Sequence, residues 1–294
     1  MSDFAEDISQ NPAPMVWITG AGGLIGNYLV QTAPRFAPGF KVFGLARSDL
    51  DLLNFSSVQQ GFKKEKPQVV IHCAALSQST ACQKQPGLAR KLNVEVTALL
   101  AELCADVPFI FFSTDLVFDG RAGDYDETDA VNPLCIYAET KVAAEKIVLA
   151  NPKHTVVRTS LNGGISPSGN RGFNEQLRLA FKSGETVKLF TDEFRSPVPA
   201  SATARAIWEL VQKNLTGLFH LAGSEKLSRW QIGQLIAARC PELNPKLQPE
   251  SLVNYHGAPR SPDTFLNCAR IQAQLSFRLP ALSEWLASCP EPAF

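Results

Sequence analysis

The feature that most constrains this chain is a short apolar segment that runs directly into a glycine-rich loop. The segment MVWITGAGGLIG begins at Met15 and places Gly20, Gly23 and Gly26 in the spacing G-x-x-G-x-x-G. Glycine adopts positive φ and lets a backbone approach a pyrophosphate closely, and a following helix offers free N–H groups to an anion. A lone glycine pattern also occurs in structural turns, but this one lies between an expected strand and an expected helix. It predicts a dinucleotide-binding loop, with contacts from Gly20, Gly23, Leu24, Ile25 and Gly26.

The rest of the first half alternates short apolar runs with helical patterns. The runs are rich in Val, Ile or Phe and are bounded by polar residues, Gly or Pro, as in parallel strands covered on both faces. This alternation predicts an α/β fold with a Rossmann-type, doubly wound parallel sheet. The expected strands are 15–19, 41–45, 68–72, 109–113 and 155–158. The expected helices begin at Gly23, at a cap on Ser56 or Ser57, at Leu88 (ending at Ala105) and near Ile136 (ending at Leu149).

The second half is less regular and predicts a smaller lobe. A loop rich in Gly, Ser and Asn spans 163–172, and helices are expected at 173–182, 200–213 and 230–239, with a return strand of the main sheet at 218–221. We expect Trp230 and Trp285 to fill the core of the lobe. The predicted domains are an N-terminal tail (1–14), a dinucleotide-binding domain (15–160 and 198–222) and a substrate-binding lobe (161–197 and 223–294).

Composition argues against several classes of function. Lys+Arg and Asp+Glu both number 28, so there is no excess of positive charge for nucleic acid. No apolar run approaches the roughly 20 residues that span a bilayer. The first residues are acidic and polar, unlike a secretory signal, so we expect a cytoplasmic protein without a membrane partner. The seven cysteines are scattered and lack a C-x-x-C pair, which predicts reduced thiols and no metal site.

The residues at the end of the second expected strand help to distinguish an NAD site from an NADP site. An acidic residue there usually holds the ribose 2′-hydroxyl of NAD. Here the strand ends in Gly-Leu-Ala-Arg-Ser, with Arg47 and no acid. A guanidinium pairs with a 2′-phosphate through two hydrogen bonds, so we predict NADP(H), with NAD(H) as the alternative. The competing interpretation is that Arg47 is simply a surface residue. Asp51 lies nearby and is a candidate contact to the adenine.

A Y-x-x-x-K pattern supplies candidate catalytic groups. Tyr137 and Lys141 lie four residues apart and share one face of an expected helix. We expect the ammonium to lower the pKa of the phenol, which would make Tyr137 an acid in carbonyl reduction and a base in alcohol oxidation. The pattern is common on exposed helices, but here it follows the fourth strand. That strand ends in Ser113 and Thr114, whose hydroxyls are expected at the ligand-binding edge of the sheet.

Together these motifs resemble those of extended short-chain dehydrogenases, and most closely the dTDP-4-dehydrorhamnose reductase branch. Further matches are Asp51-Leu52, His72-Cys73-Ala74-Ala75, Asn93, Ser-Thr-Asp-x-Val-Phe (113–118), Arg158-Thr159-Ser160, Phe194-Arg195-Ser196-Pro197 and 260–266. The resemblance implies a catalytic triad of Thr114, Tyr137 and Lys141. It also implies that Leu52, Cys73, Ala74, Ala75, Asn93 and Ser113 bind or support the dinucleotide. Asp115, Val117 and Asn162 would line the substrate. Arg195 and Arg260 are candidate partners of its diphosphate, and a surface or interdomain ion pair is the competing interpretation for both.

The resemblance implies a reductase of a nucleotide-activated 4-keto-6-deoxy sugar. Relatives often dimerise, so a homodimer is one expected assembly. Leu161 stands where the family often has an aromatic residue near the sugar, and His72 and Arg158 are expected to be structural. Two other functions use the same fold. One is a sugar-nucleotide epimerase or dehydratase. The other is a non-catalytic, NADP-binding regulatory subunit, like the beta subunit of methionine adenosyltransferase.

Overall fold

The main sheet of the protein is parallel and six-stranded. The structure, a computed structural model, describes residues 13–289. Within them the strand order is β10-β5-β4-β3-β1-β2. β2 and β3 flank β1 on opposite sides, so the connections that leave β1 and β3 run in opposite directions across the sheet. Open parallel sheets bind ligands at the carboxyl ends of the strands where the direction of connection changes. The predicted fold class is confirmed. The strands are β1 Met15–Thr19, β2 Lys41–Leu45, β3 Val69–His72, β4 Phe109–Thr114, β5 Thr155–Thr159 and β10 Gly217–Leu221.

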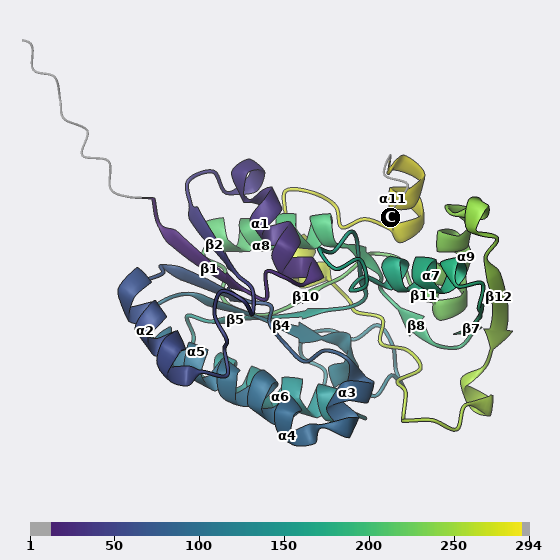
Figure 1. The fold of residues 1–294 in the computed structure, drawn as a ribbon, viewed down its shortest axis with the longest axis horizontal. Coiled ribbons are helices and arrows are strands. Elements are labelled where there is room, and N and C mark those ends of the chain that lie inside the picture. The colour runs from purple at the N-terminus through teal and green to yellow at the C-terminus, as the bar shows by residue number, and fades with distance from the viewer. Residues whose placement is uncertain (1–12, 290–294) are drawn as a thin grey trace, which may run out of the picture.

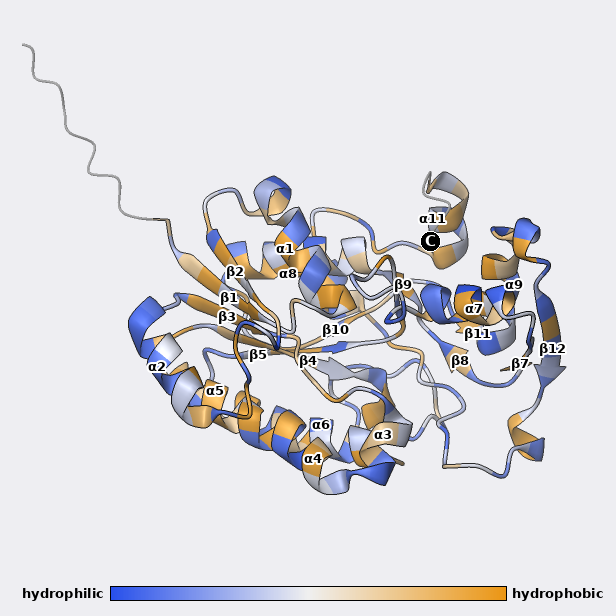
Figure 2. Cartoon of the chain, in the orientation of Figure 1, coloured by the Kyte–Doolittle hydropathy of each residue, from blue (hydrophilic) through white to orange (hydrophobic). Residues whose placement is uncertain are grey.

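Helices cover both faces of this sheet (Figure 1). Alternate side chains of β4 point to opposite sides: Ile110 and Phe112 join the core beneath α1 and α8, and Phe109 and Phe111 join the core beneath α2, α5 and α6. The strands are accordingly hydrophobic along their length, whereas the helices mix hydrophobic and hydrophilic residues (Figure 2). The helices of this domain are α1 Leu24–Phe36, α2 Phe55–Glu65, α3 Ser79–Lys84, α4 Pro86–Arg90, α5 Val96–Leu103, α6 Ile136–Leu149 and α8 Ala200–Gln212.

Two helices differ from the prediction. The cap of α2 is Asn54, whose side chain accepts a hydrogen bond from the backbone N–H of Ser57, so the predicted cap on Ser56 or Ser57 is wrong. Asn is as good a cap as Ser, and periodicity alone does not choose between neighbouring candidates. The single helix predicted from Leu88 to Ala105 is divided, because a π-helical turn, Lys91–Glu95, separates α4 from α5. Such turns often lie at functional sites.

The smaller lobe lies beside the carboxyl edge of the sheet (Figure 1). Its core joins Phe173 and Phe181 of α7 to Ile232 and Ile236 of α9, with Trp230 and Trp285 packed against them as predicted. Three two-stranded sheets complete the described part of the lobe and its junction with the main sheet. The elements are β6 Asn162–Gly163, α7 Phe173–Lys182, β7 Thr186–Phe190, β8 Phe194–Arg195, β9 Val198–Pro199, β11 Leu227–Ser228, α9 Arg229–Ala238, β12 Lys246–Glu250 and α11 Leu282–Ser288. Short 3₁₀ turns lie at Asp115–Val117, Pro241–Leu243 and Leu252–Asn254.

One part of the chain assigned to the lobe by sequence returns to the main domain. Ile271, in the short helix α10 Ala269–Gln272, and Leu279 are buried in the core beneath α1 and α8. The predicted boundary therefore needs this correction, since the chain crosses back to cover the edge of the sheet near β10. No helix within residues 13–289 is both long and apolar enough to cross a bilayer. The predicted tail lies almost wholly outside the described residues.

Candidate active site

The glycine loop is shaped by close backbone contacts. Gly20 has a φ of +73°, and a Cβ at this position would lie 2.7 Å from the backbone nitrogen of Ala74. A Cβ at Gly26 would lie 2.4 Å from the carbonyl oxygen of Gly20. Both positions therefore require glycine if α1 is to begin this close to the end of β3. Gly23 is the N-cap of α1 and provides no side chain, so the first N–H groups of the helix remain available to a phosphate.

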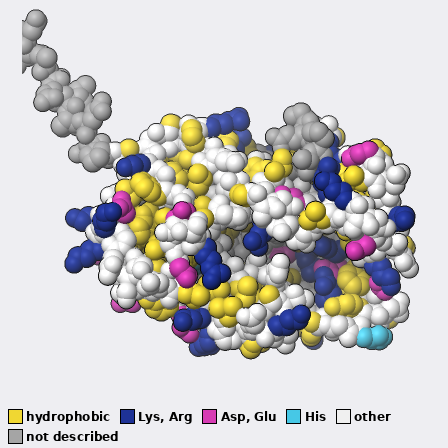
Figure 3. All heavy atoms as spheres, in the orientation of Figure 1, with side chains coloured by type: hydrophobic (Ala, Val, Ile, Leu, Met, Phe, Trp, Pro, Cys, Tyr) yellow, Lys and Arg dark blue, Asp and Glu magenta, His cyan; other side chains and the backbone are white. Residues whose placement is uncertain are grey.

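A cavity of about 690 Å³ opens beside this loop, at the carboxyl edge of the sheet. In Figure 3 the face of the molecule is hollowed near its middle, with charged side chains of both signs to the right of the hollow. Most of the residues predicted to bind the dinucleotide or the substrate line it. They are Gly20, Gly23, Leu24, Ile25, Gly26, Arg47, Asp51, Leu52, Cys73, Ala74, Ala75, Ser113, Thr114, Tyr137, Lys141 and Asn162.

At the far side of the glycine loop, the wall of the cavity carries a cation. Arg47 follows β2 and lines the cavity, together with Asp51. The carbonyl oxygen of Leu45, the last residue of β2, accepts hydrogen bonds from the backbone N–H groups of Gly20 and Ala21 at 3.0 and 3.3 Å. Arg47 is thereby held close to the loop. The charge at this wall suits a phosphorylated ribose.

Tyr137 and Lys141 line the opposite wall from the first turns of α6. Both are buried, and the ammonium of Lys141 lies 4.1 Å from the ring centroid of Phe111. Burial lowers the pKa of Lys141 to about 7. Burial, and then the carboxylate of Asp115, raise the pKa of the Tyr137 phenol. The predicted lowering of the Tyr137 pKa is therefore wrong in this structure, because burial is the largest influence on the phenol and raises its pKa. The phenol stays protonated, which is the form that donates a proton to a carbonyl oxygen.

Thr114 links the phenol to the end of β4. Its hydroxyl accepts from the backbone N–H of Leu116 at 3.2 Å and donates to Asp115 Oδ1 at 3.1 Å. Hydrogen bonding by Thr114 lowers the pKa of the Tyr137 phenol, against the larger effect of burial. The neighbouring Ser113 Oγ is buried at the cavity wall and has no hydrogen-bond partner among the described residues. A buried hydroxyl of this kind and a glycine cradle that a Cβ would fill both fit a bound dinucleotide.

Asn93 supports the cavity from behind. It lies in the π-helical turn, is buried, and does not itself line the cavity. Its Oδ1 accepts from the backbone N–H of Leu76 at 2.8 Å, and its Nδ2 donates to the carbonyl of Leu76 at 3.1 Å and to Thr140 Oγ1 at 3.0 Å. Asn93 therefore ties the segment after β3 to α6, which carries Tyr137. Val117, predicted near the substrate, is wholly buried in a separate apolar cluster.

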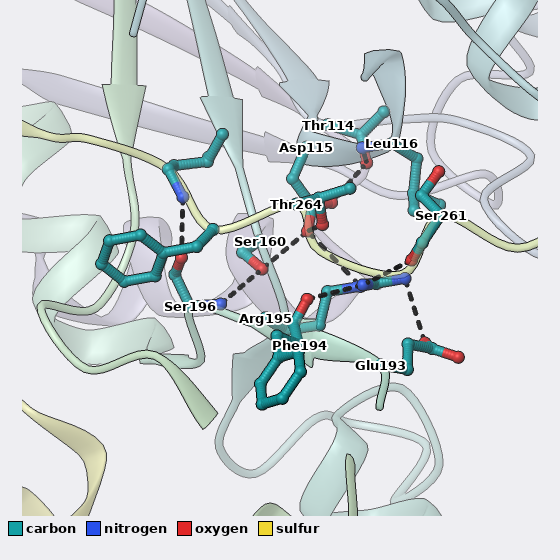
Figure 4. A network of polar contacts seen from close by, with 12 residues as sticks. Thr114, Asp115, Leu116, Ser160, Glu193, Phe194, Arg195, Ser196, Ser261 and Thr264 are labelled. Carbon is teal, nitrogen blue, oxygen red and sulfur yellow. Dashed lines mark hydrogen bonds and ion pairs between the residues drawn. The ribbon is translucent and has the colours of Figure 1, made fainter. Parts of the chain in front are cut away.

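The structure does not direct three predicted substrate residues into the cavity, namely Asp115, Arg195 and Arg260 (Figure 4 shows the first two). Asp115 and Arg195 are buried and lie 3.7 Å apart, between Oδ2 and Nε. Arg260 binds both carboxylate oxygens of Glu193, at 2.5 and 2.9 Å. Glu193 also pairs with Arg195 at 3.0 Å. These groups satisfy one another, since buried charges need partners.

The cavity instead receives two arginines that the sequence did not single out. Arg171 precedes α7 and Arg229 is the first residue of α9, and both line the cavity. Burial lowers the pKa of Arg229 to about 10. Its guanidinium makes no ion pair with a described residue within 4.0 Å, although Glu193 and Asp115 attract it from farther away. An arginine at the start of a helix is the only sequence signal that marks Arg229, and that signal is weak.

Two polar residues near the site have structural contacts. His72 is buried between the rings of Phe109 and Phe111, its Nδ1 is 2.6 Å from Thr19 Oγ1, and burial lowers its pKa to about 3. Arg158 donates from Nε and Nη2 to the two carboxylate oxygens of Glu145, at 3.0 and 2.8 Å. Both were expected to be structural, and neither lines the cavity.

Comparisons with known proteins agree with this geometry. A dTDP-4-dehydrorhamnose reductase of Sinorhizobium fredii is 28% identical over 282 residues, which cover 91% of this chain and 93% of that protein. The methionine adenosyltransferase 2 subunit beta of Bos taurus is 26% identical over 275 residues, 89% of this chain and 82% of that protein. A crystal structure of dTDP-4-dehydrorhamnose reductase from Bacillus anthracis in complex with NADP is 25% identical, with a TM-score of 0.83 over 93% of this chain and 97% of that one. The family profile of the RmlD substrate binding domain matches residues 15–292, and the chain therefore belongs to this family, as its motifs predicted.

Proposed function

We propose that the protein is an NADPH-dependent reductase of a nucleotide-activated 4-keto-6-deoxy sugar. The observation that carries this proposal is that one cavity joins the glycine loop to the hydroxyls of Thr114 and Tyr137 and the ammonium of Lys141. The names of the relatives support the same reaction, because two of the three reported above are dTDP-4-dehydrorhamnose reductases, one of them in complex with NADP.

In the proposed reaction the residues at the end of β4 and the start of α6 handle the carbonyl oxygen. NADPH, when bound, supplies the hydride that adds to the ketone carbon. Tyr137 donates its phenolic proton to the oxygen, so that the ketone becomes an alcohol. Hydrogen bonding by Thr114 lowers the pKa of the phenol and so favours the loss of that proton. Lys141 lies one turn along α6, where it supports the nicotinamide ribose and restores a proton to Tyr137.

The dinucleotide would lie along the glycine loop. The N–H groups at the start of α1 would hold its pyrophosphate, and Arg47 would hold the 2′-phosphate. Asp51 would contact the adenosine, and Ser113 would offer its unpartnered hydroxyl to the nicotinamide end. Arg47 is the feature that makes NADP(H) the preferred cofactor over NAD(H).

The diphosphate of the sugar nucleotide needs a cation in the same cavity. Arg229 is the proposed partner, because its buried guanidinium lines the cavity and makes no ion pair with a described residue within 4.0 Å. An anionic ligand would give this buried charge a partner. Asn162 and Leu161 line the cavity after β5 and would contact the sugar.

Two other functions compatible with the fold are less well supported. An epimerase or dehydratase of sugar nucleotides is not favoured by the relatives named above. A purely regulatory role, as in the relative named as a subunit of methionine adenosyltransferase, does not account for the retained triad of Thr114, Tyr137 and Lys141 around one cavity.

The test is an assay of NADPH consumption. We expect purified protein to oxidise NADPH, followed by the loss of absorbance at 340 nm, when a dTDP-4-keto-6-deoxy sugar is present and not when it is omitted. A panel of such sugars differing in configuration is used, with NADH in parallel. Binding of NADPH without turnover of any sugar in the panel would favour the regulatory role.

A further inference from the structure

A buried carboxylate lies directly behind the proposed catalytic hydroxyls. Asp115 follows Thr114 in the chain, and both of its oxygens are engaged (Figure 4). Oδ1 accepts from Thr114 Oγ1 at 3.1 Å, and Oδ2 accepts from Ser160 Oγ and Thr264 Oγ1, both at 2.8 Å. The three hydroxyls come from the end of β4, the segment after β5 and the C-terminal segment. Asp115 therefore joins three distant parts of the chain at one point.

The charge of this carboxylate is balanced from the smaller lobe. Arg195 belongs to β8, and its Nε lies 3.7 Å from Asp115 Oδ2. Its remaining nitrogens are held by Glu193 at 3.0 Å and by the carbonyl oxygens of Phe194 and Ser261 at 2.6 and 3.0 Å. The guanidinium is buried and has little freedom to move. Its position relative to Asp115 is thus set by the packing of β8 and of the chain around Ser261.

The contact with Asp115 fixes the orientation of the Thr114 hydroxyl. A threonine hydroxyl has one hydrogen, and here that hydrogen points to Asp115. The oxygen of Thr114 accepts from the backbone N–H of Leu116. These two contacts hold the hydroxyl in one orientation at the cavity wall, beside Tyr137.

We propose that Arg195 is a positioning residue: by holding Asp115, it fixes the orientation of the Thr114 hydroxyl beside Tyr137. Arg195 does not line the cavity, so it acts through Asp115 and not on the ligand. Because β8 is part of the smaller lobe, the orientation of Thr114 depends on that lobe being packed against the sheet. This inference rests on the proposed reductase function, and it assigns Arg195 a role different from the diphosphate contact expected from sequence.

The first test is a kinetic double-mutant cycle with Arg195→Met, Asp115→Asn and the double variant, using NADPH and the sugar turned over by the wild type. We expect kcat to fall about tenfold or more in each single variant, and the double variant to lie within about threefold of Asp115→Asn, because the two residues act as one unit. The KM for the sugar nucleotide should stay within about threefold of the wild type. Arg205→Met, at a surface ion pair with Glu209, is the matched control and should keep the wild-type kcat.

Three results would overturn the proposal. One is a folded Arg195→Met variant with the kcat of the wild type. The second is a double variant whose loss equals the product of the single losses. The third is a raised KM with an unchanged kcat, which would make Arg195 a substrate-binding residue. If Arg195→Met fails to fold, the same cycle is measured with Arg195→Lys, which keeps the charge but not the planar fork.

A second readout does not depend on turnover. The chain has four tyrosines, so labelling with [¹³Cζ]tyrosine gives few resonances, and Tyr137→Phe assigns the one of interest. We expect the Tyr137 resonance to shift in Arg195→Met and in Asp115→Asn, and to stay in place in Arg205→Met. An unmoved Tyr137 resonance in both active-site variants would refute the positioning role. If the wild type shows no turnover, the proposed function fails, while this spectrum still decides the positioning role.

Discussion

The phenol of Tyr137, on α6, is hydrogen-bonded to the hydroxyl of Thr114, the last residue of β4. This contact joins a helix and a strand that carry the two groups expected to act on a carbonyl oxygen. Burial raises the pKa of the phenol, so Tyr137 holds a proton at neutral pH.

Replacing Tyr137 by Phe should therefore remove turnover and spare cofactor binding. General acid catalysis contributes about 10²–10⁴-fold to rate, and we expect kcat to fall by an amount in this range. The dissociation constant for NADPH, measured by fluorescence titration, should change by less than about threefold, since the glycine loop and Arg47 are untouched. Turnover at the wild-type rate in this variant would remove Tyr137 from the mechanism.

Arg47→Ala should weaken the binding of NADPH and leave that of NADH unchanged. A hydrogen bond to a charged group contributes about 1.5–3 kcal/mol, which corresponds to roughly a 10- to 150-fold rise in the dissociation constant for NADPH. Because NADH has no 2′-phosphate, its affinity is the internal control. Equal losses for both dinucleotides would mean that Arg47 acts on the shape of the site and not on the phosphate.

Gly20→Ala should reduce both stability and NADPH affinity. The new Cβ would lie 2.7 Å from the nitrogen of Ala74, and the residue would have to keep a φ of +73°. Strain of this kind costs on the order of 1–3 kcal/mol. Gly39→Ala is the control, because a Cβ there meets nothing within 4 Å. The two variants are compared by urea denaturation, and equal midpoints would contradict the crowding at Gly20.

Replacing only one partner of the ion pair between Arg158 and Glu145 should lower the free energy of unfolding. Both side chains are about 5% exposed, and Nη2 lies 2.8 Å from Oε2. Arg158→Met leaves a buried carboxylate without its partner, so we expect a loss of about 3–5 kcal/mol in the free energy of unfolding. The double variant Arg158→Met with Glu145→Leu should recover part of this loss. A double variant less stable than Arg158→Met would show that the carboxylate alone is tolerated.

Acid should destabilise the fold partly through His72. Its pKa is about 3 in the folded protein and 6.5 when exposed, so between these values the unfolded chain binds more protons than the folded one. Stability is therefore complete above about pH 6.5 and falls as the pH is lowered towards 3. The variant His72→Asn cannot titrate, and its thermal midpoint should depend less on pH between 6.5 and 4. Parallel curves for the two proteins would exclude His72 as the cause.

Much of this architecture follows from local patterns in the sequence. The glycine spacing, the run of apolar strands and the pair Tyr137 and Lys141 each have a short-range physical cause: positive φ or close approach, burial on both faces, and one shared helix face. These features predicted the sheet, the cofactor loop and the triad, and the structure brings the triad and the loop to one cavity.

What only the tertiary structure decided depends on contacts between residues far apart in the chain. The pairing of Arg195 with Asp115, the turn of Arg229 into the cavity and the return of Ile271 to the main core leave no periodic signal in the sequence. The same holds for the pKa of Tyr137, which a neighbouring lysine would lower in water but which burial raises here. Local spacing records which residues share a face, whereas burial and the choice of ionic partner emerge only when separate elements pack together.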